Sequence, residues 1–347
     1  MRKIYLIRHG KPDLPSGEQW CLGRTDVPLG VLGRMQAQIL RHIPELQSVK
    51  TVFASPLRRA RETARILSEE IQVIPDLQER DMGEWDGLCF SDIRRKWPDL
   101  YEVRKRWPDI LPDGAETMEH VKERVERAVR SCLSNSEGDI LIVTHRGAIA
   151  SLVGSRQTVG YGTVTLLGVE EGKIHSMEVG RVYHPELTDE LCHDLMVSSG
   201  VGRVMEEHGA TVAFLADHFV EMLSLRGARL SGKEIHQACL LHDIARRYAN
   251  HATQGASWMQ TLGYPQVADL IRQHHQPDIP GIHDASIVFV ADKCVTGNRV
   301  VGLEDRLFES ERYRRNPEAM REHMEKRRMA EVVANQMNYL CQDRLVP

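Results

Sequence analysis

Residues 3–10 read KIYLIRHG, a short apolar run that ends in a basic residue, a histidine and a glycine. A second run, ILIVT at residues 140–144, is also followed by a histidine, a basic residue and a glycine. Amphipathic stretches at 33–43, 57–70 and 147–152 alternate with such runs along the first half of the chain. Strands that alternate with helices form a parallel sheet with helices on both faces. We therefore predict an α/β fold with a doubly wound, mostly parallel sheet.

Two histidines come directly after predicted strands. Arg8, His9 and Gly10 follow the first strand, and His145 follows the strand at 140–144. In an open parallel sheet, ligands collect beyond the carboxyl ends of the strands. We therefore expect the two imidazoles to meet at one edge of the sheet, with two unrelated loop histidines as the alternative.

A third segment, SPLRRARETA at residues 55–64, starts a helix immediately after the strand at 51–54. The free backbone N–H groups of a helix start and the guanidinium of Arg59 both favour an anion. Phosphate fits this chemistry. Plain capping of the helix by the Ser-Pro start is the alternative.

The chain has 347 residues, more than one compact core usually holds, so we expect two domains. We assign residues 1–183 to the α/β domain, 184–195 to a linker and 196–347 to an all-α domain with a C-terminal helix, because strand patterns give way to helical periodicity there. That last helix, predicted from Asn316 to Leu345, has apolar residues suited to packing or dimerisation. Because dimerisation through this helix is one of the two roles, a homo-oligomer is a possible assembly of the chain.

The composition excludes several classes of protein. Lys plus Arg number 45 against 49 for Asp plus Glu, so no broad basic field attracts nucleic acid or anionic lipid. The seven cysteines are scattered and form no C-x-x-C pair, which argues against disulfides and a thiolate zinc site. No run approaches the roughly 18 apolar residues of a membrane span. We expect a cytoplasmic protein with neither nucleic-acid nor membrane partners.

Six ordered motifs between Arg2 and about residue 180 resemble those of the histidine phosphatase superfamily, the phosphoglycerate-mutase-like enzymes. They are RHG (8–10), GRTDVPL (23–29) with Gly33, Gln36 and Ala37, SPLRRARETA (55–64), LQE (77–79) with GEWDG (83–87), DGAET (113–117) and VTH (143–145). The resemblance implies that His9 is the nucleophile and Glu79 the proton donor. It assigns the phosphate pocket to Arg8, Gly10, Arg59 and His145, and it implies no cofactor in this domain.

General chemistry agrees with these roles. A neutral imidazole can attack phosphorus near pH 7 and split hydrolysis into two displacements through a phosphohistidine. Guanidiniums and a second imidazole, His145, can hold the charge that builds on the phosphoryl oxygens without a metal. A glutamate can protonate the leaving oxygen and then act as base toward water.

Two departures from the family pattern favour a phosphatase over a phosphoglycerate-type mutase. Arg146 stands where the family usually has a small residue, and Lys11-Pro12 stand where mutases typically have an acidic or polar residue. Among phosphatases, the GRTDVPL run resembles the α-ribazole-phosphate phosphatases.

The second half carries a His, His-Asp, Asp order. His208 precedes an apolar helix, His242-Asp243 follow the apolar stretch ACLL at 238–241, and Asp292 closes the apolar run IVFVA at 287–291. A carboxylate in such surroundings is costly to bury unless it is paired or coordinated. The pattern resembles the HD-domain metal-dependent phosphohydrolases over about residues 197–306, and the resemblance makes these four residues metal ligands.

Further histidines extend this pattern. His251 and His274 lie between the second and last ligands, as in HD enzymes that carry two metals. Mixed His and Asp ligation suits Fe, Mn, Co or Zn better than Ca. Helix capping or surface exposure is the alternative for both residues, and we expect the neighbouring His275 to be a bystander. Lys293 and Arg299 are candidates for phosphate contacts, with solvated surface charge as their alternative.

These expectations combine into a bifunctional phosphohydrolase that acts on small phosphorylated metabolites or nucleotides. One half hydrolyses phosphomonoesters through His9, and the other hydrolyses a phosphoester or nucleotide with divalent metal. Two alternatives stay open: a histidine phosphatase regulated by a non-catalytic, ligand-sensing HD domain, and a phosphoglycerate-type mutase.

Overall fold

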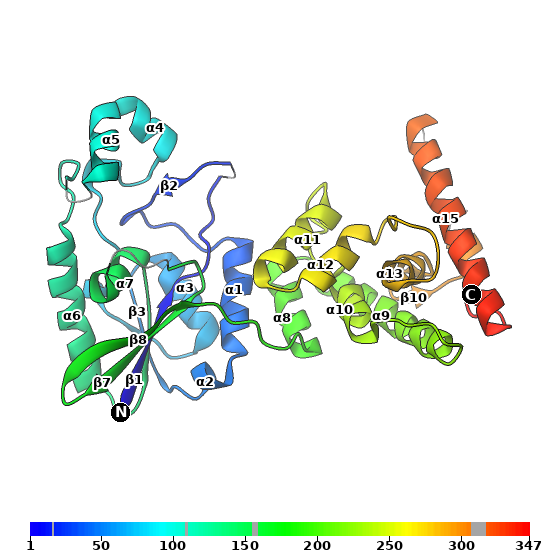
Figure 1. The fold of residues 1–347 in the computed structure, drawn as a ribbon, viewed down its shortest axis with the longest axis horizontal. Helices are drawn as coiled ribbons and strands as arrows, with labels where there is room; N and C mark the ends of the chain where they lie inside the picture. The colour runs from blue at the N-terminus through cyan, green and yellow to red at the C-terminus, as the bar shows by residue number, and fades with distance from the viewer. Residues whose placement is uncertain (16, 108–109, 155–158, 307–316) are drawn as a thin grey trace. The chain divides into compact units, whose positions relative to one another are not determined.

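The computed structural model describes residues 1–15, 17–107, 110–154, 159–306 and 317–347. The chain forms two compact units, Met1–Pro185 and Glu186–Pro347 (Figure 1). Each unit contains a hydrophobic interior of its own, and each is described separately below.

The first unit is built on a six-stranded sheet with the order β4-β3-β6-β1-β7-β8. β1, β3, β4 and β6 run parallel, and β7 and β8 add an antiparallel hairpin at one edge. Its strands are β1 (Arg2–Arg8), β2 (Trp20–Cys21), β3 (Thr51–Ala54), β4 (Gln72–Val73), β5 (Leu88–Cys89), β6 (Ile140–Thr144), β7 (Val164–Glu170) and β8 (Lys173–Arg181). Its helices are α1 (Val31–Arg41), α2 (Pro44–Gln47), α3 (Arg58–Leu67), α4 (Phe90–Lys96), α5 (Pro98–Arg106), α6 (Met118–Ser134) and α7 (Arg146–Val153), with short turns η1 (Pro75–Leu77) and η2 (Gly83–Trp85).

Alternating residues of the central strands feed two separate cores. Ile4 and Leu6 of β1 pack on one face with residues of α6 and α7. Tyr5 and Ile7 pack on the other face with residues of α1 and α3. Helices therefore cover both faces of the sheet (Figure 1), and the predicted doubly wound α/β fold is confirmed.

In its described residues, the second unit is helical apart from one two-stranded hairpin. It contains α8 (Asp189–Ser199), α9 (Arg203–Ser224), α10 (Gly232–Leu241), α11 (His251–Leu262), α12 (Pro265–Gln273), α13 (Asp284–Lys293), β9 (Val295–Thr296), β10 (Arg299–Val300) and α15 (Pro317–Cys341). The apolar run at 287–291 lies in α13, and each of its five residues is fully buried. α9 and α15 both pack against this helix. The all-α character predicted for this half is confirmed.

The structure differs from the sequence prediction at both ends of this unit. Residues 189–195, predicted as linker, belong to α8, because Leu191, Cys192 and Leu195 are buried and give the segment a packed face. The C-terminal helix ends at Cys341 rather than Leu345, and Asn316 lies outside the described residues. Val333 and Met337 of this helix are buried, so its apolar face packs within the unit.

The seven cysteines are all buried and free. Among the helices of the described ranges, none combines the length and the hydropathy required for a membrane crossing.

Candidate functional site

The first candidate site forms where β1 and β6 end. The two strands are parallel neighbours, and Arg8 pairs with Thr144 in their register. A histidine directly follows each strand, so His9 and His145 lie at the same edge of the sheet. Their ring centroids lie 5.0 Å apart, and both side chains are buried. The expected meeting of the two imidazoles is present in the structure.

The hydrogen bonds of His9 define its tautomer. His9 Nδ1 lies 2.7 Å from the carbonyl oxygen of Gly10, to which it donates, and His9 Nε2 accepts a hydrogen bond from Arg59 Nε at 3.1 Å. Burial, followed by the charges of Arg59 and Arg8, lowers the pKa of His9 well below its ordinary value. His9 is therefore neutral at pH 7, with the lone pair of Nε2 directed toward a guanidinium.

Two arginines supply fixed positive charge beside His9. Arg59 is 1% exposed, and its guanidinium donates to the carbonyl oxygens of Thr25 at 2.6 Å and Gly23 at 2.8 Å. The GRTDVPL segment thus holds Arg59 in place. Arg8 donates to the carbonyl oxygen of Val159 at 2.7 Å and stacks on Tyr161, with its guanidinium carbon 3.8 Å from the ring centroid.

The two ring nitrogens of His145 have different surroundings. Its Nε2 lies 2.7 Å from Ser55 Oγ. Its Nδ1 is buried and has no hydrogen-bond partner among the residues that the structure describes. Burial and the charge of Arg59 lower the pKa of His145 well below its ordinary value. A neutral imidazole protonated at Nδ1 would offer a hydrogen bond to an anion at this point.

Glu79 is held by backbone N–H groups. Its Oε1 accepts hydrogen bonds from Arg80 N at 2.8 Å and from Gly147 N at 2.9 Å. A Cβ atom added at Gly147 would lie 2.4 Å from this oxygen, so a larger residue there would displace the Glu79 carboxylate. Burial lowers the pKa of Arg8 and of Arg59, and the charge of Glu79 counteracts both shifts. The charge of the Glu79 carboxylate therefore reaches both guanidiniums of the pocket.

The sequence analysis missed two residues of this pocket. Ser55 was considered only as part of a helix start, and Tyr161 was not considered. Tyr161 carries no pattern signal, whereas Ser55 directly follows a strand that neighbours β6 and so had a positional signal. Arg58, the neighbour of Arg59, is exposed and pairs with Glu62 at 3.3 Å.

The second candidate site is a cluster of histidines and aspartates in the helical unit. His208 comes from α9, His242 and His274 follow the last residues of α10 and α12, and His251 begins α11. Three of these imidazoles donate from Nδ1 to a backbone carbonyl oxygen: His208 to Gly297 at 2.7 Å, His242 to Cys239 at 2.8 Å and His274 to Ile271 at 2.7 Å. Each ring is thereby fixed in orientation, with Nε2 as the nitrogen that can meet a ligand.

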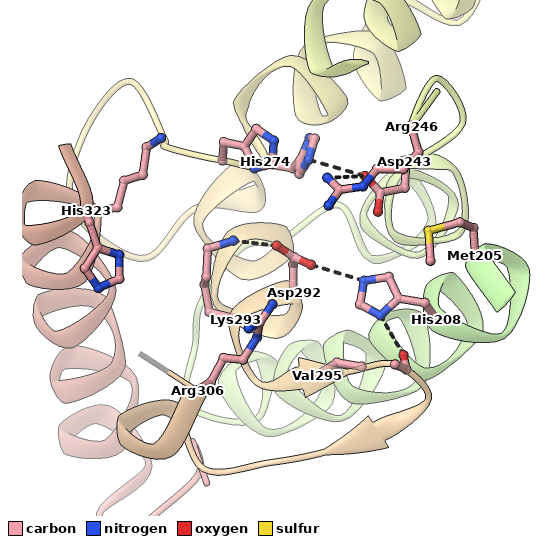
Figure 2. A pocket seen from close by; sticks show the side chains of 13 residues that line it. Met205, His208, Asp243, Arg246, His274, Asp292, Lys293, Val295, Arg306 and His323 are labelled. Atoms are coloured by element: carbon pink, nitrogen blue, oxygen red, sulfur yellow. Dashed lines mark hydrogen bonds and ion pairs between the residues drawn. The ribbon is translucent and has the colours of Figure 1, made fainter. Parts of the chain in front are cut away.

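The two aspartates face these Nε2 atoms, and Figure 2 shows the contacts of Asp292 with His208 and of Asp243 with His274. Asp292 Oδ1 lies 3.2 Å from His208 Nε2 and 3.5 Å from His242 Nε2. Asp243 Oδ1 lies 3.2 Å from His251 Nε2 and 4.0 Å from His274 Nε2. Burial opposes ionisation of Asp292, but the charge of Lys293 and the two histidine contacts hold its pKa well below its usual range.

Potential metal-ligand atoms form two groups in the described part of the chain. His208, His242 and Asp292 form one, and His251, His274 and His275 form the other, with the ligand atoms of each group within 4.8 Å of one another. His275, expected to be a bystander, belongs to the second group and lies 2.9 Å from His251, Nε2 to Nε2. Burial and the charge of Lys293 lower the pKa of His275 to about 3, so it is neutral. The adjacent pair His274-His275 at a helix end was the sequence signal for it.

These residues fit a divalent metal. His242 Nε2 and His274 Nε2 are buried and make no hydrogen bond within the described residues. Buried polar atoms without a partner are rare because they lose their hydration. Imidazole nitrogens that face buried carboxylates are a donor set that Fe, Mn, Co and Zn accept.

The two sites define an enzyme that handles phosphate esters, one site with guanidiniums and one suited to metal. The chain belongs to the histidine phosphatase superfamily (branch 1), whose family model matches residues 4–182. A second family model, that of the HD domain, matches residues 205–297. The protein is a phosphoric ester hydrolase, and its HD domain is of a kind that generally depends on metal.

Individual relatives match about half of the chain. Phosphoglycerate mutase-like protein 4 of Arabidopsis thaliana is 31% identical over 159 residues, which cover 43% of this chain and 69% of that protein. The adenosylcobalamin/alpha-ribazole phosphatase of Escherichia coli is 29% identical over 157 residues, covering 44% and 77%. The solved structure of Bacillus stearothermophilus YhfR is 27% identical with a TM-score of 0.48, covering 52% of this chain and 98% of that one.

Proposed function

We propose that the first unit hydrolyses small phosphomonoesters through a phosphohistidine on His9. The observation that carries this proposal is the contact of 3.1 Å between Arg59 Nε and His9 Nε2, with Nδ1 of the same ring bonded to Gly10. This contact brings a neutral imidazole and an always-charged guanidinium together. A phosphoryl group entering there would take over the Arg59 hydrogen bond and meet the Nε2 lone pair.

The reaction then takes two displacements. In the first, a bond forms between His9 Nε2 and phosphorus as the ester P–O bond breaks, and Glu79, which enters this step protonated, gives its proton to the leaving oxygen. In the second, Glu79 takes a proton from water, the water oxygen bonds to phosphorus, and the P–N bond breaks to release phosphate. Arg8, Arg59 and the Nδ1–H of His145 stabilise the charge on the phosphoryl oxygens throughout.

The substrate class is a small phosphorylated metabolite. The Escherichia coli relative, named as an alpha-ribazole phosphatase, supports this class together with the GRTDVPL segment that holds Arg59. A phosphoglycerate-type mutase would instead return the phosphoryl group to the substrate. An assay of inorganic phosphate against isomerised product separates the two.

Replacement of the nucleophile tests the proposal. His9→Ala in the full-length protein should abolish EDTA-resistant release of phosphate from phosphomonoesters. The matched control is His120→Ala, which changes an exposed histidine of the same unit. A rapid quench with ³²P-labelled substrate should trap an alkali-stable, acid-labile label on the wild-type protein and none on His9→Ala. Wild-type turnover by His9→Ala would refute the mechanism.

We further propose that the HD domain hydrolyses a second phosphoester. His208, His242, Asp243, His251, His274 and Asp292 would hold one or two divalent ions, Fe, Mn, Co or Zn. Such ions polarise phosphate oxygens and lower the pKa of bound water. The protein residues fix the imidazole orientations through the Nδ1–H bonds described above, and Lys293 orients Asp292 by an ion pair.

The His9→Ala protein offers a clean background for the second activity. After treatment with EDTA and addition of Mn²⁺ or Fe²⁺, it should release phosphate from members of a panel of nucleotides and phosphoesters. A non-catalytic, sensing HD domain would bind metal or ligand without turnover on any member of the panel. That result would replace the hydrolytic proposal with the regulatory one.

A further inference from the structure

A cavity of about 480 Å³ opens beside the histidine and aspartate cluster of the second unit. Cavities of this size accommodate ligands much larger than a single phosphate group. Figure 2 shows Asp243 and Arg246 on one side of it and His323 and Arg306 on the other, with Lys293 between them. The cavity therefore extends well beyond the residues that fit a metal.

The far wall comes from segments that follow the HD match. That match ends at residue 297, whereas Arg306 precedes α15 and His323 and Lys326 belong to α15. All three residues line the cavity. His323 is 3% exposed although it lies on the C-terminal helix. Arg306 Nε is buried and makes no hydrogen bond with any described residue. A guanidinium nitrogen in such a position is suited to donate a charge-assisted hydrogen bond to an anion.

The cavity carries an excess of positive charge. Arg246, Lys293, Arg306 and Lys326 line it, and Asp243 and Asp292 are the acidic residues among its described lining. Arg246 and Lys293 each contact one of these carboxylates. Arg306 and Lys326 have no carboxylate opposite them in this lining. Within the described lining, the positive charge on the wall away from the aspartates is therefore not offset by a carboxylate.

We propose that this cavity binds a chain of two or more phosphates, with Arg306, His323 and Lys326 holding the phosphates farthest from the aspartates. The inference rests on the proposed hydrolytic function of the HD domain and specifies its substrate class. One phosphate lies near Asp243 and Asp292, where hydrolysis is proposed. The next phosphates extend across Lys293 to the far wall. A monoester would leave that wall without an anion.

Calorimetric titration of the full-length protein in EDTA tests the proposal without turnover or metal. Inorganic tripolyphosphate should bind more tightly than orthophosphate. Arg306→Ala and Lys326→Ala should each weaken tripolyphosphate binding about tenfold, the loss of one charge-assisted contact. Both should change orthophosphate binding less than about twofold, since one phosphate does not span the cavity. Thermal unfolding of each variant reports whether its fold is intact.

Arg328→Ala is the matched control, because Arg328 is an exposed residue of the same helix. It should bind tripolyphosphate as the wild type does. Any binding by the phosphate pocket of the first unit is common to all these variants and cancels in the comparison. Equal tripolyphosphate affinities for Arg306→Ala, Lys326→Ala and Arg328→Ala would overturn the proposal, as would an equal loss for both probes.

A third probe identifies the source of the phosphate chain. Tighter binding of adenosine 5′-(β,γ-imido)triphosphate than of tripolyphosphate would support a nucleoside polyphosphate, and the reverse order would support an inorganic chain. Lys326→Arg should restore binding if charge at this position is what matters. Failure of the hydrolytic proposal looks different, because tripolyphosphate would still bind in EDTA while metal restored no turnover in the His9→Ala protein.

Discussion

The two units use buried imidazoles in opposite surroundings. His9 in the first unit and His242 in the second each donate from Nδ1 to a backbone carbonyl oxygen, which leaves Nε2 as the functional atom. Around His9 the neighbours are guanidiniums, and the pKa of the imidazole falls. Around His242 the neighbours are Asp243 and Asp292, and although burial opposes them, these carboxylates raise the pKa of the ring. The charge of the neighbours thus distinguishes His9, the proposed nucleophile, from His242, a proposed metal ligand.

Removal of the Arg59 guanidinium from the first unit should have the largest effect on activity. Arg59→Ala should lower kcat/KM for a phosphomonoester in EDTA about a thousandfold, because a preorganised donor to the phosphoryl oxygens is lost. Arg59→Lys should restore little, since a lysine cannot reproduce the fork that reaches His9, Thr25 and Gly23 together.

Arg58→Ala serves as the matched control for Arg59. It removes an adjacent but exposed arginine and should keep kcat/KM within about twofold of the wild type, as expected for a surface ion pair. If Arg58→Ala were as damaging as Arg59→Ala, the assignment of the pocket would be wrong.

Removal of a carboxylate from the second unit is the corresponding test. Asp292→Asn should weaken binding of Mn²⁺ or Fe²⁺ at least about a hundredfold, since loss of a direct ligand exceeds the effect of an outer contact. Metal content measured by mass spectrometry after dialysis reports this loss. The EDTA-resistant phosphomonoesterase activity of the same protein should not change, because it belongs to the other unit.

Asp269→Asn controls for the change of charge. Asp269 is an exposed residue that pairs with Arg272, and its replacement should leave the metal content as in the wild type. Wild-type metal content in Asp292→Asn would contradict the ligand assignment.

Replacement of Glu79, the proposed proton donor, should have a smaller effect on the rate of hydrolysis, and the size of this effect should depend on the leaving group. Glu79→Gln should slow hydrolysis of an alkyl phosphate about a hundredfold but spare p-nitrophenyl phosphate, whose leaving oxygen needs no proton. Gly147→Ala should produce a weaker form of the same pattern, about tenfold, since its Cβ would displace Glu79 Oε1. The ratio of kcat values for the two substrates is the measurement. Equal losses on both substrates would assign Glu79 a structural rather than an acid role.

The sequence was most informative where function follows the ends of regular elements. His9 and His145 could be expected to meet because parallel neighbouring strands end at one edge, a rule that needs only the strand pattern. The linker was harder to predict from the sequence. Leu191, Cys192 and Leu195 form a packed helical face within a segment that begins with proline and polar residues. Local composition favoured a loop there, and tertiary packing decided for a helix.

Site residues that come from segments distant in the chain could not be predicted from the sequence. Tyr161 stacks on Arg8, and Arg306 and His323 line the cavity near Asp292, although no motif or spacing relates these positions. Their placement follows from the packing of β7 on β1 and of α15 on α13. Such long-range contacts are set by the assembled core, which a pattern of single residues does not encode.

The smallest expected effect is on the pH dependence of the first unit. Because burial and the charges of Arg59 and Arg8 lower the pKa of His9, the neutral nucleophile persists as the pH falls below 6.5. The NMR signal of His9, assigned by its loss in His9→Ala, should not titrate between pH 8 and 6. After correction for substrate ionisation, kcat/KM should fall less than about threefold between pH 7 and 6, because kcat/KM follows ionisations of the free enzyme. Titration of His9 at pH 6.5 or above would mean that the guanidiniums do not face the ring in solution, and the contrast with His242 would fail.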